Sequence, residues 1–231
     1  MERVPTGIEG LDRLIEGGFP RPSSILLTGA TGSGKSILGI QYLYKGAVDH
    51  DEPGIMISIE SYATGFQWYA ERFNFDIGAL QKKKKLIFTS YDPADFRKFE
   101  LRTLHSEIIL QINRLIDQIG AKRLVIDSIA PIGHAITDRD AYRTLLYYIS
   151  KAMKEKGVTT IFITEKPKDK LTTYDFEQYV MDGVLELSFV PKDDALARTL
   201  IVHKMVATNF PQAGYLVEIG DSGMSLVTTY V

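Results

Sequence analysis

Residues 29–36 form the stretch whose residue types and spacing most directly indicate chemistry. They read Gly-Ala-Thr-Gly-Ser-Gly-Lys-Ser and fit the pattern G-x-x-x-x-G-K-[ST]. The glycines of such a loop point successive backbone N–H groups at phosphate oxygens, and the helix that follows adds the positive end of its dipole. The lysine contacts the outer phosphates and the serine hydroxyl binds Mg²⁺. We therefore expect a nucleotide-binding loop made of Gly29, Ala30, Thr31, Gly32, Ser33, Gly34, Lys35 and Ser36.

The sequence around the loop favours this interpretation over a glycine-rich turn that holds no ligand. Apolar residues 25–27 predict a buried strand before the loop, and residues 37–44 have helical spacing after it. Residues 124–126 form a further buried run that ends directly at Asp127. We expect Asp127 to hold the Mg²⁺ opposite Ser36, directly or through water.

A second carboxylate follows a buried strand in the same way. The β-branched run at residues 55–59 ends in Glu60. Open α/β sheets bind their ligands at the carboxyl ends of parallel strands. Glu60 is therefore a candidate for the same site.

The rest of the chain predicts the elements that position these residues. Apolar spacing predicts a short lid helix at residues 6–15, helices at 66–73, 101–119 and 141–156, and strands at 86–88 and 158–164. This alternation is typical of an α/β fold with a mostly parallel central sheet and helices on both faces. Strands near residues 183–190, 199–206, 215–219 and 224–229 have only turns between them, which predicts an antiparallel C-terminal edge.

The composition narrows the class of protein. With 231 residues, 45% of them hydrophobic, the chain can bury one sizeable core, and we expect a single domain over residues 1–231. The net charge of -2 gives no global attraction to nucleic acid or anionic lipid. The absence of cysteine excludes disulfides and thiolate metal sites. No apolar run reaches the ~18 residues of a membrane span, so we expect a soluble, cytoplasmic protein without a membrane partner.

Several motifs together resemble one known family. They are Thr-Gly-Ile-Glu-Gly-Leu-Asp at residues 6–12, Gly-Gly-Phe-Pro at 17–20, the phosphate loop, Ala-Lys-Arg-Leu-Val-Ile-Asp-Ser at 121–128 and Arg-Thr-Leu at 198–200. Over nearly its whole length the chain resembles the single-domain archaeal relatives of the circadian-clock ATPase KaiC, within the RecA superfamily. The resemblance implies a RecA-like P-loop NTPase core that binds ATP or ADP with Mg²⁺. It also implies a homo-oligomer, often a hexamer, with ATP between subunits, and it places Asp221 near the nucleotide base.

Departures from the family pattern concern hydrolysis. The family usually ends its second strand in two adjacent glutamates, whereas this chain has Glu60 followed by Ser61. By similarity to related helicases, one glutamate is enough to orient the attacking water as a general base. Glu165 falls where the superfamily has a polar residue that reports the γ-phosphate, and a plain loop carboxylate is an equally good interpretation.

A second departure affects the contact with a neighbouring subunit. The family tends to have Lys-x-Arg-Gly and then Thr-x-His on a late strand that reaches the neighbour's site. Here Lys204 is kept, while Val206 and Phe210 stand in place of the arginine and the histidine. An arginine finger is worth ~10³–10⁵ in rate. The resemblance therefore implies a catalytic role for Lys204 in trans, and slow turnover.

We considered functions of different classes. The first is a slowly hydrolysing ATPase that acts as a switch for assembly or partner binding. The second is a recombinase paralogue whose loops at residues 133–139 and 166–170 contact nucleic acid in a central channel, with Lys166, Lys168 and Lys170 on phosphates. The third is a nucleotide-binding scaffold that does not hydrolyse ATP.

Overall fold

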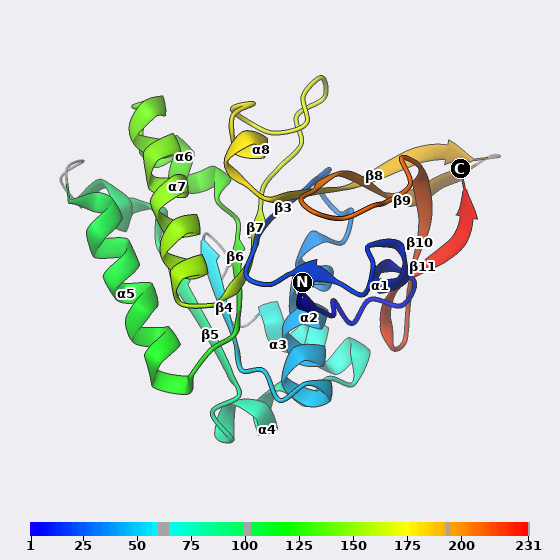
Figure 1. Cartoon of the computed structure of the whole chain (residues 1–231), viewed down its shortest axis with the longest axis horizontal. Coiled ribbons are helices and arrows are strands. Elements are labelled where there is room, and N and C mark those ends of the chain that lie inside the picture. Colours follow the sequence, from blue (N-terminus) through cyan, green and yellow to red (C-terminus); the bar gives the residue numbers. More distant parts are fainter. Residues whose placement is uncertain (60–64, 99–102, 193–194, 231) are drawn as a thin grey trace.

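A nine-stranded sheet forms the centre of the molecule, in the order β11-β10-β9-β8-β3-β7-β6-β4-β5 (Figure 1). The structure is a computed structural model, and it describes residues 1–59, 65–98, 103–192 and 195–230. The strands from β3 to β5 in this order are parallel. Their bounds are β3 (Ser24–Gly29), β7 (Thr159–Ile163), β6 (Arg123–Asp127), β4 (Gly54–Ile59) and β5 (Leu86–Tyr91). The predicted α/β fold with a mostly parallel sheet is confirmed.

Helices cover both faces of this sheet, because side chains alternate between faces along each strand. On β3, Ile25 and Leu27 pack in one core and Leu26 packs in the other. The first core includes residues of α2 (Lys35–Asp49), α3 (Gly65–Phe73) and α4 (Ile77–Lys82). The second includes residues of α5 (Leu104–Ile119), α6 (Ala130–Ala135) and α7 (Arg139–Glu155), with the short 3-10 helix η1 (Pro93–Lys98) beside them.

The C-terminal strands form the antiparallel edge that the sequence predicts. They are β8 (Gly183–Lys192), β9 (Ala195–Met205), β10 (Gly214–Gly220) and β11 (Gly223–Tyr230). β8 pairs in parallel with β3 and antiparallel with β9, so it joins the two parts of the sheet. Figure 1 shows β10 and β11 at the opposite end of the molecule from α5.

The N-terminal segment differs from the prediction. Within residues 6–15 only α1 (Leu11–Leu14) is helical, and a two-stranded sheet of β1 (Arg3–Val4) and β2 (Phe19–Pro20) flanks it. Gly7 and Gly10 have positive φ angles of 71° and 86°, which interrupt a helix. Leu11 and Ile15 are fully buried in the core. The prediction of a lid helix is therefore wrong, and the segment forms part of the packed core.

Among the described residues, the short α-helices α4, α6 and α8 (Glu177–Val180) and the 3-10 helix η1 were not predicted. α6 begins at Ala130-Pro131 and occupies part of the stretch expected to be a channel loop at residues 133–139. Proline favours the first turn of a helix, so Pro131 was a usable start signal. In the part of the chain that the structure describes, no helix is long and apolar enough to cross a bilayer.

Candidate functional site

The loop at residues 29–36 connects the end of β3 to the start of α2. Lys35 and Ser36 are the first residues of the helix, preceded by Gly34 in the left-handed region with φ of 103°. Asp127 is the last residue of β6. The Ser36 hydroxyl donates a hydrogen bond to the Asp127 carboxylate, with 2.5 Å between Oγ and Oδ2. The structure thus brings together the two residues that the sequence assigns to the metal.

Lys35 lies in the same charged group. Its ammonium donates to the carbonyl oxygens of Gly29 and Ala30, at 2.9 Å each. Burial lowers the pKa of Lys35, while the carboxylates of Asp127 and Glu165 act in the opposite direction. The Glu165 carboxylate therefore lies close enough to Lys35 to favour its charged form.

Burial also affects the carboxylate. It raises the pKa of Asp127, and the Ser36 hydrogen bond and the Lys35 charge only partly offset it. A partly desolvated carboxylate beside a hydroxyl gives hard oxygen donors, which suit Mg²⁺. Magnesium ions in nucleotide sites usually take one or two protein ligands and complete their shell with phosphates and water. The residues present fit this arrangement.

Strands from the C-terminal edge close around the loop. A Cβ atom added at Gly29 would lie 2.1 Å from the carbonyl oxygen of Leu187 on β8. A Cβ atom at Gly34 would lie 2.8 Å from Cε of Met224 and 3.2 Å from Cδ1 of Ile219. Close packing against backbone therefore requires a glycine at position 29, whereas at position 34 the main requirement is the positive φ of 103°.

A cavity of about 600 Å³ opens beside the loop, between the ends of β8, β9, β10 and β11. Arg198 on β9 lies at its wall and donates to the carbonyl oxygen of Gly32 at 3.3 Å. The guanidinium also lies 5.3 Å from the ring centroid of Phe189. Arg198 belongs to the 198–200 motif of the sequence, but its contact with the loop depends on the pairing of β8 and β9.

Asp221 lies in the turn between β10 and β11, beside Gly220 and Ser222, which line this cavity. Its carboxylate accepts a hydrogen bond from Arg72 of α3 at 2.7 Å, and the Asp221 side chain is 90% exposed. The expected contact of Asp221 with a nucleotide base stays a prediction. Its place at the rim of the cavity is compatible with that role.

Two further residues, Lys204 and Glu60, are predicted to be catalytic. Lys204, near the end of β9, donates to the carbonyl oxygens of Met181 at 2.6 Å and Gln178 at 3.3 Å. Within one chain its ammonium therefore holds the end of α8. Glu60 falls outside the described residues; β4 ends at Ile59, and its neighbour Ser58 pairs with Asp127 in the sheet.

Comparison with known proteins agrees with this geometry. A family model described as the ATPase KaiC matches residues 4–229. The circadian clock oscillator protein KaiC of Prochlorococcus marinus subsp. pastoris is 32% identical over 97% of this chain, but the match covers 45% of that protein. The chain thus spans about half the length of the KaiC proteins that it matches.

Relatives of similar length are also found. UPF0273 protein MJ1359 of Methanocaldococcus jannaschii is 30% identical over 97% of this chain and 96% of its own length. The crystal structure of the KaiC-like protein PH0186 of Pyrococcus horikoshii superposes with a TM-score of 0.85 at 34% identity, covering 98% of this chain and 99% of that one. The chain belongs to the KaiC family of ATPases.

Proposed function

We propose that this protein is a single-domain, Mg²⁺-dependent ATPase that binds ATP tightly, hydrolyses it slowly and uses nucleotide occupancy as a switch. The observation that carries the proposal is the 2.5 Å contact between Ser36 Oγ and Asp127 Oδ2 at the start of α2. Two oxygen donors from distant parts of the chain meet there, next to the Lys35 ammonium. Membership of the KaiC family of ATPases supports the same reading.

The loop residues bind the phosphates. Phosphate oxygens pair more strongly with an ammonium group than neutral carbonyls do, so Lys35 exchanges its bonds to Gly29 and Ala30 for the β- and γ-phosphates. Ser36 and Asp127 would hold Mg²⁺, which neutralises charge that develops on the phosphates when it is bound. Glu165, whose charge acts on Lys35, would report the presence of the γ-phosphate.

The adjacent cavity of about 600 Å³ would take the nucleoside. Phe189 offers a ring face and Arg198 a planar guanidinium, both of which stack on bases. Asp221 at the rim is a candidate for a hydrogen bond to the base. Together these groups would fix the nucleotide at both ends.

Hydrolysis needs two further groups. We assign Glu60 as the base that orients the attacking water, because it directly follows β4 in the sequence and Ser58 of β4 pairs with Asp127 of β6. Lys204 would act on the site of a neighbouring copy in a homo-oligomer such as a hexamer. Tyr179, next to one carbonyl partner of Lys204, is 73% exposed, and Val206, directly after β9, is 39% exposed; an interface at this place would bury both side chains.

The nucleic-acid function receives less support. Lys166 pairs with Glu186 at 3.2 Å and Lys170 pairs with Asp175 at 2.6 Å. Two of the three lysines of this loop therefore have carboxylate partners within the chain, which reduces their availability for phosphates. We favour the nucleotide switch.

Replacing the loop lysine tests the proposal. Lys35→Ala should weaken Mg·ATP binding by about a hundredfold or more, equivalent to ~2.7 kcal/mol, while the unfolding midpoint stays within a few degrees. Lys151→Ala is the matched control, because Lys151 is an exposed lysine on α7. Equilibrium titration with a fluorescent ATP analogue gives both affinities. Unchanged affinity in Lys35→Ala would exclude the phosphate-loop assignment.

A further inference from the structure

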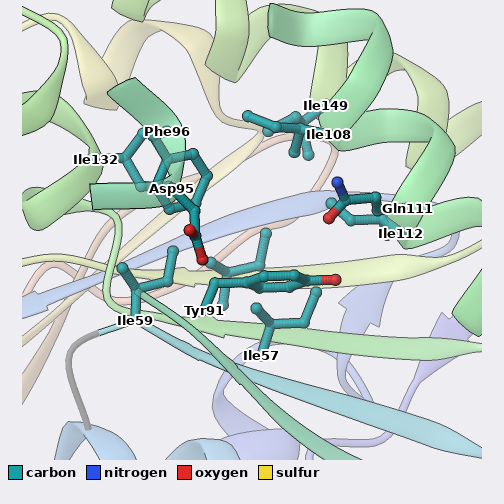
Figure 2. A pocket seen from close by; sticks show the side chains of 11 residues that line it. Ile57, Ile59, Tyr91, Asp95, Phe96, Ile108, Gln111, Ile112, Ile132 and Ile149 are labelled. Carbon is teal, nitrogen blue, oxygen red and sulfur yellow. The ribbon is translucent and has the colours of Figure 1, made fainter. Parts of the chain in front are cut away.

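An apolar cavity of about 260 Å³ lies between the sheet and the layer of α5, α6 and α7. Isoleucine side chains from both sides form most of its wall (Figure 2), and no residue of the phosphate loop lines it. A dry cavity of ~150 Å³ is enough to bind benzene. The cavity therefore has room for a molecule of two fused rings.

Two aromatic residues shape the space. Figure 2 shows the Tyr91 ring edge-on, so that one of its faces is turned toward the space below Ile108, with Phe96 on another side. Aromatic rings attract one another when they stack with an offset or meet edge to face. A flat aromatic molecule suits these walls better than a branched aliphatic one.

Polar groups line one part of the cavity. The Tyr91 hydroxyl is on the side where Gln111 lies, and the Asp95 carboxylate projects between Ile59 and Tyr91 (Figure 2). The Tyr91 oxygen and the Gln111 carbonyl can each accept a hydrogen bond from a ligand. The Asp95 carboxylate repels an anion. The isoleucine walls cannot solvate a charged ligand, and the carboxylate adds repulsion of an anion, so the chemistry selects an uncharged compound with an N–H or O–H donor.

We propose that this cavity is a regulatory site for a neutral, planar aromatic compound of about the size of indole, whose occupancy changes the affinity for Mg·ATP. The second part rests on the proposed function. Ile59 is the last residue of β4, and Ile126 directly precedes Asp127 on β6. Both side chains line the cavity. An occupant therefore touches the two strand ends that carry the candidate general base and the metal ligand, without touching the nucleotide.

Binding is tested with 5-fluoroindole as the probe, and fluorine NMR detects its binding to the full chain. Wild-type protein should show saturable binding at one site. Gln111→Phe fills the cavity from its polar edge and should weaken binding about tenfold or more, whereas Leu110→Phe, a 46% exposed neighbour on the same helix, should leave it within about twofold. Tyr91→Phe removes only the hydroxyl and should weaken binding several-fold. The anion 5-fluoroindole-3-acetate should bind at least about tenfold more weakly than 5-fluoroindole.

No saturable binding to wild type, or equal binding to wild type and a folded Gln111→Phe, would overturn the site. Lys35→Ala should still bind 5-fluoroindole, so loss of the nucleotide site is distinguishable from loss of this one. Coupling is measured as the Kd of Mg·ATP with and without saturating 5-fluoroindole, and we expect a change of about fivefold or more. An unchanged Kd with the cavity occupied would contradict the regulatory role.

Discussion

The Asp127 carboxyl group is partly buried, but it must be deprotonated to bind a cation. Burial raises its pKa, and the Ser36 hydrogen bond and the Lys35 ammonium compensate in part. The same burial lowers the pKa of Lys35. The charge of each group nevertheless favours the charged form of the other.

The raised pKa of Asp127 gives a pH-dependence. Only the deprotonated carboxylate binds a cation, and a raised pKa lets protons compete at a higher pH than at an ordinary aspartate, which titrates near ~3.9. Mg²⁺-dependent ATP affinity should therefore fall as the pH is lowered from neutral into the acid range. Calorimetric titrations across this range measure it.

Asp127→Asn separates this effect from protonation of ATP itself. The variant should bind Mg·ATP about tenfold or more weakly at neutral pH, equivalent to ~1.4 kcal/mol. Its remaining affinity should show only the pH-dependence of the nucleotide. Parallel pH profiles in wild type and Asp127→Asn would show that Asp127 is not the titrating ligand.

At the scale of elements, Arg123 joins β6 to α2 through the carbonyl oxygen of Tyr42, and it pairs with Glu52 in the loop after α2. Arg123 at the start of β6 is fully buried; its Nε donates to Glu52 at 2.7 Å, and its NH1 donates to carbonyl oxygens of Pro5 and Tyr42. Gly46 makes room for it, since an added Cβ would lie 2.2 Å from the arginine Nε. β6 begins at this arginine and ends at Asp127, so the pair helps to set the position of the candidate metal ligand.

Breaking this pair should destabilise the fold. Arg123→Leu leaves Glu52 with Arg21 as its remaining cation and removes the bonds to two carbonyl oxygens. Loss of one partner of a buried pair typically costs about 3–5 kcal/mol. Urea unfolding at neutral pH measures the free energy of unfolding of both proteins. A decrease below ~1 kcal/mol in Arg123→Leu would show that the pair contributes little.

Glu52, the carboxylate partner of Arg123, predicts a pH-dependence of stability. Burial raises the pKa of Glu52, but the hydrogen bonds and charges of Arg21 and Arg123 outweigh this effect and lower it. A depressed pKa contributes stability above the unfolded value of ~4.3 and loses it as the pH falls through the folded pKa. The stability gap between wild type and Glu52→Gln should therefore narrow below about pH 4. Glu155→Gln, in an exposed pair with Lys151, is the control and should show little gap at any pH.

The core elements were predictable because their signals are local. The runs before Gly29 and Asp127 are buried strands, and the helix predicted over residues 101–119 is found as α5 from Leu104 to Ile119, residues 101–102 lying outside the described part of the chain. The contact between Ser36 and Asp127 followed from the rule that parallel strands end at one edge.

The contact of Arg198 with Gly32 was not predictable in this way, because it depends on the register between β8 and β9. The cavity near Tyr91 likewise arises from tertiary packing, which the spacing of apolar residues in the sequence does not predict.

At the scale of the whole molecule, we expect the turnover rate to depend on the side chains that one subunit contributes to the ATP site of its neighbour. Val206 stands where the family tends to have an arginine, and its side chain is 39% exposed. If the family geometry holds in an assembly, Val206→Arg should raise the turnover number about tenfold or more, since trans arginines stabilise charge in the transition state. The gain should appear only where the protein assembles, which light scattering reports.

Two controls accompany this variant. Glu60→Gln should remove both the basal and the gained activity, since the proposed base is lost. Ser61→Glu, which restores the second glutamate, should change turnover less than Val206→Arg does. A Val206→Arg variant that is no faster in the assembled state would point to another group, and Arg72 and Arg198 would then be the first to replace.

Steady-state phosphate release, measured with the oligomeric state in the same buffer, tests the central claim most directly. We expect ATP to bind tightly and to turn over more slowly than about one per second, with release that requires Mg²⁺ and disappears in Lys35→Ala and Asp127→Asn. Release faster than about one per second in wild type, or release that survives in Lys35→Ala, would contradict the account.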